Sequence, residues 1–119
     1  MQLVRDRPEM FLLLIEQWFR AMREPEQRPV FNENFQRMLD ATTEWVVEEA
    51  QRGGYELRVA AEHVALGALA LPIGMAIEYM ADPDSVPDGL LEVLGLAYFG
   101  GLRSSPARPE KAAAASDSE

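Results

Sequence analysis

The segment from His63 to Ser85, HVALGALALPIGMAIEYMADPDS, is the strongest constraint on how this chain can fold. It reads as one long apolar helix, yet Pro72, Gly67 and Gly74 stand inside it. An interior proline costs a helix about 3 kcal/mol, and each glycine costs about 1 kcal/mol relative to alanine. We therefore expect packing to offset this cost, because Gly67, Ala70 and Gly74 would form a nearly flat flank that another helix can approach closely.

Apolar residues recur at helical spacing along the rest of the chain, and no segment shows sustained two-residue alternation. The sequence predicts an all-α fold, an antiparallel bundle of four main helices. The expected ranges are 8–23, from 29–32 to 53–54, 59–81 and 87–99. The expected boundary signals are Asp6 and Pro8 at the first start, Gly53 and Gly54 at the second end, Pro83 after the third helix, Ser85 as the cap of the fourth, and Gly100 and Gly101 after it.

Two further features concern the organisation of the domain. Apolar residues cover most of the circumference of the first helix, so we expect this helix to be enclosed at the centre of the bundle. From Ser104 onward the chain has no apolar residue larger than alanine, which predicts a disordered tail over 104–119 after a single domain over 1–103.

The third and fourth helices lack the charged face that a helix on the outside of a monomer needs. Their ionisable residues are Glu62, His63 and Glu78 in the third, and Asp88 and Glu92 in the fourth. We expect a homodimer in which these two helices of each subunit form an intersubunit four-helix bundle, burying the ~1,600 Å² typical of a stable interface. The residues expected at this interface are Gly67, Ala70, Leu71, Gly74, Leu90, Leu94, Ala97 and Tyr98.

The net charge of −9 makes direct nucleic-acid contact by this chain unfavourable, because a phosphate backbone would repel it. The chain has no cysteine, which excludes a disulfide framework and fits the cytoplasm. The uncharged stretch 64–77 falls short of the roughly 20 apolar residues that cross a bilayer, so we expect a soluble protein without a membrane partner.

We find no pattern for catalysis, a metal or a cofactor. His63 is the single histidine and has no ligand partner at metal-binding spacing. Glu44 and Glu48 lie one helical turn apart, but they belong to a charged, solvated face. No serine precedes Ser85, so a nucleophilic triad is unsupported, and we expect a protein that is not an enzyme.

A kink at Pro72 beside aromatic side chains can leave a cavity for a small hydrophobic effector. Methionine and aromatic residues suit such a pocket, because they accept varied apolar ligands. The candidate ligand-binding residues are Trp18, Met22, Phe35, Met38, Met75 and Tyr79. The same residues at helical spacing also fit a dry core, and the sequence leaves both readings open.

The order of several short motifs resembles the C-terminal regulatory domain of tetracycline-repressor-like (TetR family) transcriptional regulators. The matching positions are Glu16, Trp18 and Ala21 in the first helix, Glu24 and Pro25 at the break after it, Gly54, Leu57 and Arg58 after the second helix, Gly74 in the third, and Asp82 to Asp84 before the last. The resemblance covers about residues 5–102. Each motif is weak alone, and their order and spacing carry the match.

The resemblance implies a helical domain that dimerises through its last two helices and holds a small effector. In that family the effector acts on N-terminal helix-turn-helix domains, which the residues before Pro8 are too few to form. We therefore expect either a fragment of a longer regulator or a free-standing regulatory domain. An alternative hypothesis is a helical protein that forms mixed dimers with full-length regulators and blocks them.

Overall fold

The computed structural model describes residues 2–104 and confirms the all-α class. The elements are α1 (Gln2–Asp6), α2 (Pro8–Arg23), the 3-10 helix η1 (Pro25–Gln27), α3 (Arg28–Gly53), β1 (Glu56–Leu57), α4 (Ala61–Ala81), the 3-10 helix η2 (Pro83–Ser85), α5 (Leu90–Leu102) and β2 (Arg103–Ser104). The tail expected from the sequence lies, apart from Ser104, outside the described residues.

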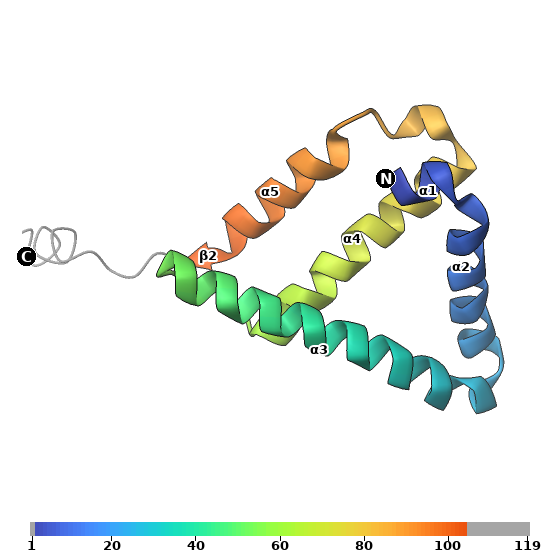
Figure 1. Ribbon diagram of the computed structural model, residues 1–119, viewed down its shortest axis with the longest axis horizontal. Coiled ribbons are helices and arrows are strands. Elements are labelled where there is room, and N and C mark those ends of the chain that lie inside the picture. Colours follow the sequence, from blue (N-terminus) through green and yellow to red (C-terminus); the bar gives the residue numbers. More distant parts are fainter. Residues whose placement is uncertain (1, 105–119) are drawn as a thin grey trace, which may run out of the picture.

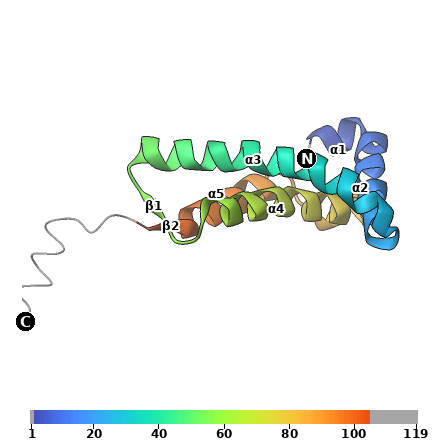
Figure 2. The ribbon, with the colours of Figure 1, turned by 90° about the horizontal axis from the view of Figure 1, so that it is seen from below.

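The helices α2, α3 and α4 form the three sides of a triangle, and α5 runs back alongside α4 in the opposite direction (Figure 1). Seen from below, α3 lies in one layer while α4 and α5 lie in another (Figure 2). The largest helix contact is between α3 and α4, and α2 meets α3 through the short corner at η1. This arrangement gives the molecule three corners.

Local signals set most of the predicted helix boundaries. The helix α2 begins at Pro8 and ends at Arg23, as the sequence predicts. Gly54 ends α3 with a left-handed φ of 66°, and its N–H bonds to the carbonyls of Ala50 and Gln51. After α4, the Asp82 carboxylate accepts the N–H of Asp84 at 3.1 Å, so the chain turns there as expected.

The predicted start and end of the last helix are wrong. Ser85 does not cap α5 but lies in η2, where its hydroxyl donates to the Asp82 carbonyl at 2.7 Å. Gly89, at φ 82°, delays the helix to Leu90. Gly100 continues the helix instead of releasing the chain, because β2 after it pairs with β1 and holds this end of α5 in place.

The N-terminal boundary also differs from expectation. Residues 2–6 form the short helix α1, which the sequence did not predict. Arg7 stands at the N-cap position of α2, and its side chain makes no capping hydrogen bond.

The structure has two small cores. Val4, Phe11 and Ala76 join α1, α2 and α4, and a second cluster of Val46, Val64 and Ala65 joins α3 to α4, with Tyr98, Phe99 and Leu102 of α5 packed against it.

The expectation that the first helix is enclosed at the centre is wrong. The helix α2 forms one side of the triangle and buries only Phe11 and Ala21. Leu13 on its outer surface is 58% exposed and Met22 is 62% exposed. Each side of an open triangle meets its neighbours mainly at its ends, which leaves much of the helix uncovered.

By length and composition, α4 is able to cross a membrane, although the uncharged stretch within it is shorter. Its two acidic residues, Glu62 and Glu78, stand near its ends, so the helix between them is uncharged. The core helix of a soluble protein can be equally long and apolar, so a single helix of this kind is weak evidence for a membrane. Of the most apolar part of α4, only 17% is buried, so the described chain leaves much of this apolar helix uncovered.

Candidate functional site

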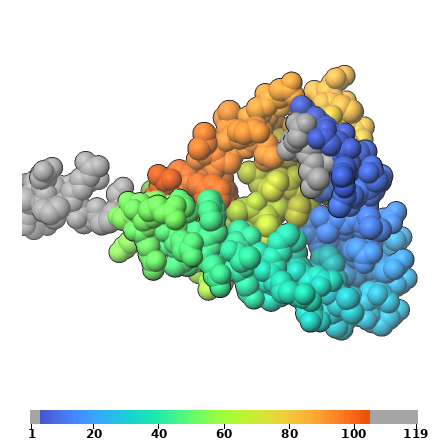
Figure 3. Space-filling view, in the orientation of Figure 1, coloured from blue at the N-terminus to red at the C-terminus, as the bar shows by residue number. Residues whose placement is uncertain are grey.

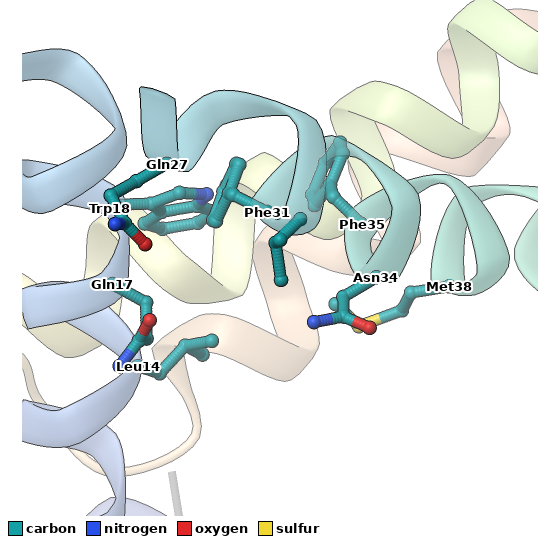
Figure 4. Close-up of a pocket in the computed structure, with 9 residues that line it drawn as sticks. Leu14, Gln17, Trp18, Gln27, Phe31, Asn34, Phe35 and Met38 are labelled. Atoms are coloured by element: carbon teal, nitrogen blue, oxygen red, sulfur yellow. The ribbon is translucent and has the colours of Figure 1, made fainter. Parts of the chain in front are cut away.

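A cavity of about 180 Å³ lies at the corner where α2, η1 and α3 meet (Figure 4). Its lining residues are Leu14, Gln17, Trp18, Gln27, Val30, Phe31, Asn34, Phe35 and Met38. The corner is fixed by Arg28, whose guanidinium donates to the Ala21 carbonyl at 2.9 Å and to the Met22 carbonyl at 3.2 Å. These bonds satisfy carbonyls in the last turn of α2 and hold the start of α3 against it.

Three aromatic rings form one wall of this cavity. Phe31 and Phe35 lie one turn apart on α3 with nearly parallel rings, 5.9 Å between centroids and 8° between planes. Trp18 of α2 meets them at 5.9 and 6.2 Å, tilted by 60° to each. Offset and edge-on arrangements at these distances are favourable for aromatic pairs. The wall is therefore a packed unit with one ring from α2 and two from α3.

Three carboxamides complete the lining, one from each element of the corner. Gln17 comes from α2, Gln27 from η1 and Asn34 from α3 (Figure 4). The Asn34 oxygen accepts a hydrogen bond from Arg37 at 3.2 Å. The lining, all of it within the described residues, contains no ionisable side chain. The cavity thus offers apolar surface and neutral hydrogen-bonding groups, but no charge.

A second, wider cavity of about 660 Å³ opens between α2, α3 and α4. It is lined by Trp18, Ala21, Met22, Arg28, Phe31, Asn32, Ala70, Ile73, Gly74 and Ile77. Trp18 and Phe31 belong to both linings, so they stand between the two cavities. In the space-filling view, α4 stays visible between α3 and α5 (Figure 3).

Four of the six candidate ligand-binding residues lie on these cavities. Trp18 lines both, Phe35 and Met38 line the first, and Met22 lines the second. Tyr79 packs instead on the cluster of Val4, Phe11 and Ala76, with the Arg5 guanidinium 5.5 Å from its ring centroid. Met75 lies on α4 and lines neither cavity.

Sequence reasoning did not identify the polar part of the lining. Gln27 lies in a segment that the sequence predicts only as a helix break. Gln17 directly precedes Trp18, but a glutamine in a helix carries no pattern that predicts a pocket. Phe31 could have been found, because it stands one helical turn before Phe35 and both must face α2 if either does.

Two of the eight candidate interface residues pack within the chain. A Cβ on Gly67 would overlap the Tyr98 hydroxyl, so this glycine allows Tyr98 of α5 to reach α4. That hydroxyl donates to the Val64 carbonyl at 2.7 Å, and burial raises the pKa of Tyr98 above its ordinary value.

Gly74 and Ala70 line the second cavity and are exposed, as is Ala97 on α5, whereas Leu71, Leu90 and Leu94 are partly buried. The largest exposed apolar residues of α5 are two that were not predicted, Val93 at 63% and Leu96 at 78%. Their neighbours on this helix face, Ala97 and Gly100, are also exposed. The outer face of α5 is therefore apolar.

In the part of the chain that the structure describes, no group of three histidine, aspartate or glutamate side chains is placed to hold a metal ion. His63 is exposed near the start of α4, away from both cavity linings. Arg5 forms an ion pair with Asp88 that raises the pKa of the guanidinium and ties α1 to the loop before α5.

The model of one protein family matches residues 1–104, nearly the whole chain. The family is described as the C-terminal domain of BetI-type transcriptional repressors, a class of regulators and not of enzymes. Neither a curated protein nor a solved structure matches the chain. The helical fold, the motif order seen in the sequence and this match agree, and the chain belongs to the family of C-terminal regulatory domains of BetI-type, TetR-like transcriptional repressors.

Proposed function

We propose that this chain is the regulatory domain of a cytoplasmic transcriptional repressor, forming a homodimer and binding a small hydrophobic effector. The observation that carries the effector proposal is the corner cavity with its wall of Trp18, Phe31 and Phe35. The dimer proposal rests on the uncovered apolar surface of α4 and α5. The chain itself makes no contact with nucleic acid in this proposal, because its net charge is −9.

The helix α5 supports dimerisation because it is strongly apolar and yet buries no residue in the described chain. Val93 and Leu96 stand on its outer face, and Glu92 is its sole carboxylate. Contiguous exposed apolar surface of this kind marks interfaces in soluble proteins. A second copy suits it because a twofold axis would place the same face opposite itself, which pairs apolar residues with apolar residues.

The dimer is tested by Leu96→Glu, with Leu13→Glu as the matched control. Leu13 is 58% exposed on α2, so both substitutions place a carboxylate on an already exposed leucine. We expect a dimer for the natural chain and for Leu13→Glu, and a monomer for Leu96→Glu, because two carboxylates would face each other across the axis. Light scattering at micromolar concentration measures the mass, and circular dichroism verifies that each variant is folded. A monomeric, folded natural chain would refute the proposal.

The effector site is tested by filling it. Met38→Trp should occupy the corner cavity, whereas Met10→Trp changes an exposed methionine of α2 that does not line it. A thermal-shift screen with lipophilic cations, antibiotics and acyl compounds would identify a ligand. At a hundredfold excess over its Kd, such a ligand stabilises by about 2.7 kcal/mol. Met38→Trp should abolish the response and Met10→Trp should keep it. No response to any class would leave a dry corner and refute effector binding.

The mixed-dimer hypothesis gains no support from the family match, which describes a regulatory domain and does not name its partner. The light-scattering experiment bears on it as well. A stable homodimer of the natural chain would show that α5 can be covered without a longer partner.

A further inference from the structure

The corner cavity is selective in its chemistry, because its nine lining residues are aromatic, aliphatic or carboxamide side chains. Among the described residues, neither the Gln17 nor the Gln27 side chain has a hydrogen-bond partner in the protein. Both therefore have donors and acceptors that a ligand can use. A carboxamide bonds equally well as donor and acceptor, which favours ligands that carry both functions.

We propose that this cavity binds the uncharged, single-ring aromatic head of the effector, with its carbonyl or amide edge hydrogen-bonded to Gln17 and Gln27. This inference rests on the proposed effector-binding function and narrows it to one class of ligand. Its basis is the combination of an aromatic wall, neutral polar groups and a small volume in one place.

The volume sets the size of the head. A cavity of about 150 Å³ in another protein accommodates benzene. The corner cavity, at about 180 Å³, therefore has room for one six-membered ring with a small substituent, and the rest of a larger ligand would lie outside it. A longer apolar part of the ligand would lie outside this cavity, toward solvent or toward the second cavity on the other side of Trp18 and Phe31.

Charged ligands are disfavoured for two reasons. An ion entering the cavity gives up part of its hydration and finds no counter-ion in the lining. A quaternary ammonium group would need ring faces turned toward it, as in an aromatic cage. Here the rings pack on one another, with centroids 5.9 to 6.2 Å apart, so their faces do not enclose a space.

The test compares three probes that share a ring and a size: benzamide, which is neutral, benzylammonium and benzoate. The protein is the full chain with Trp45→Phe, because Trp45 lies at the other end of α3 against Phe99 and its removal leaves Trp18 as the single tryptophan, which is excited selectively over tyrosine. We expect saturable binding of benzamide and roughly tenfold or more weaker binding of both ions at 0.15 M salt.

A substitution that adds a charge to the cavity then tests whether Gln17 binds the probe. Gln17→Glu keeps the shape of the side chain and places a carboxylate in the cavity. It should weaken benzamide about tenfold and strengthen benzylammonium about tenfold, because an opposite charge is now present. Gln51→Glu adds the same charge at an exposed position of α3 outside the lining and should change neither affinity.

The outcomes separate this inference from the function on which it rests. If benzylammonium or benzoate binds as tightly as benzamide, the neutral class is wrong, although effector binding at this corner survives. If none of the three probes gives a saturable Trp18 signal, the single-ring assignment is wrong, and the thermal-shift screen with Met38→Trp decides effector binding separately. Unchanged probe preference in Gln17→Glu would also overturn the assignment to Gln17.

Discussion

The corner where α3, α4 and α5 meet contains a fully buried residue, whereas the cavity where α2 meets α3 has none in its lining, although aromatic side chains dominate both. At the first corner, Tyr98 and Phe99 pack on Val64, which is fully buried, and a cavity of about 190 Å³ lies beside Trp45 and Phe99. At the second corner, Trp18 and Phe31 pack on each other beside the cavity of about 180 Å³, and no residue of its lining is buried. The aromatic content of a region therefore does not decide whether it forms a core.

The difference lies in the residues that the rings meet. Tyr98 meets Gly67, whose missing side chain lets the ring reach the α4 backbone and bond to the Val64 carbonyl. Beside the cavity between α2 and α3 the rings are half-buried, and the other side of the space is lined by flexible residues such as Gln17 and Met38. This lining has no glycine or alanine that would let a ring approach the neighbouring backbone as Gly67 does.

The largest expected effect comes from making the same change at both corners. Val64→Ala removes a side chain with no exposed surface and should lower the free energy of unfolding by about 2–3 kcal/mol. Val30, on the lining of the cavity between α2 and α3, is 61% exposed, and Val30→Ala should change stability by less than about 0.5 kcal/mol. Urea denaturation followed by circular dichroism measures both. Equal costs would show that the two corners do not differ as described.

Two glycines of α4 should respond with opposite signs. A Cβ on Gly67 would lie 2.8 Å from Cζ of Tyr98, so Gly67→Ala should destabilise by about 1–2 kcal/mol through overpacking. A Cβ on Gly74 meets nothing within 4 Å, and Gly74→Ala should stabilise by up to about 1 kcal/mol through helix propensity. Thermal melts of the two variants compare them directly. A loss of stability in Gly74→Ala would indicate that another surface covers this glycine.

The smallest effect concerns pH. Burial raises the pKa of Tyr98 above 10.0, so folding favours its neutral form. This contribution is complete below pH 10 and is lost as the pH rises through the raised pKa. Tyr98→Phe should cost about 1 kcal/mol at pH 7 through the lost hydrogen bond to Val64. The difference in melting temperature between the natural chain and Tyr98→Phe should therefore shrink above pH 10. A constant difference would mean that Tyr98 does not ionise there.

The sequence predicted boundaries where a single residue determines the backbone. Pro8 starts α2 and Gly54 ends α3 through conformations that depend only on those residues and their neighbours. The prediction was wrong at α5, because its start depends on the left-handed turn at Gly89 and its end on pairing with β1. Strand pairing joins residues that are distant in sequence, and a helical period carries no information about it.

The residues of the candidate site also divide into those that local spacing predicts and those that tertiary contacts place. Helical spacing placed Phe35 and Met38 on one face of α3, because residues three or four apart share a helix face. The same reasoning could not place Tyr79, whose position depends on how α4 lies against α1 and α2. Nor could it find Gln27, because the geometry of the turn that brings this amide to the cavity is set by the tertiary contact of Arg28 with the end of α2.

The pairing of β1 with β2 has a consequence for how the molecule opens. The N–H of Arg58 bonds to the Leu102 carbonyl at 3.0 Å, and this contact joins the start of α4 to the end of α5. The turn through η2 joins the other ends, so the two helices form a loop that is closed at both termini. Separating them requires breaking the hydrogen bond from the Arg58 N–H. The hydrogen-exchange protection of that one amide therefore gives a lower bound on the free energy of opening the whole helical hairpin.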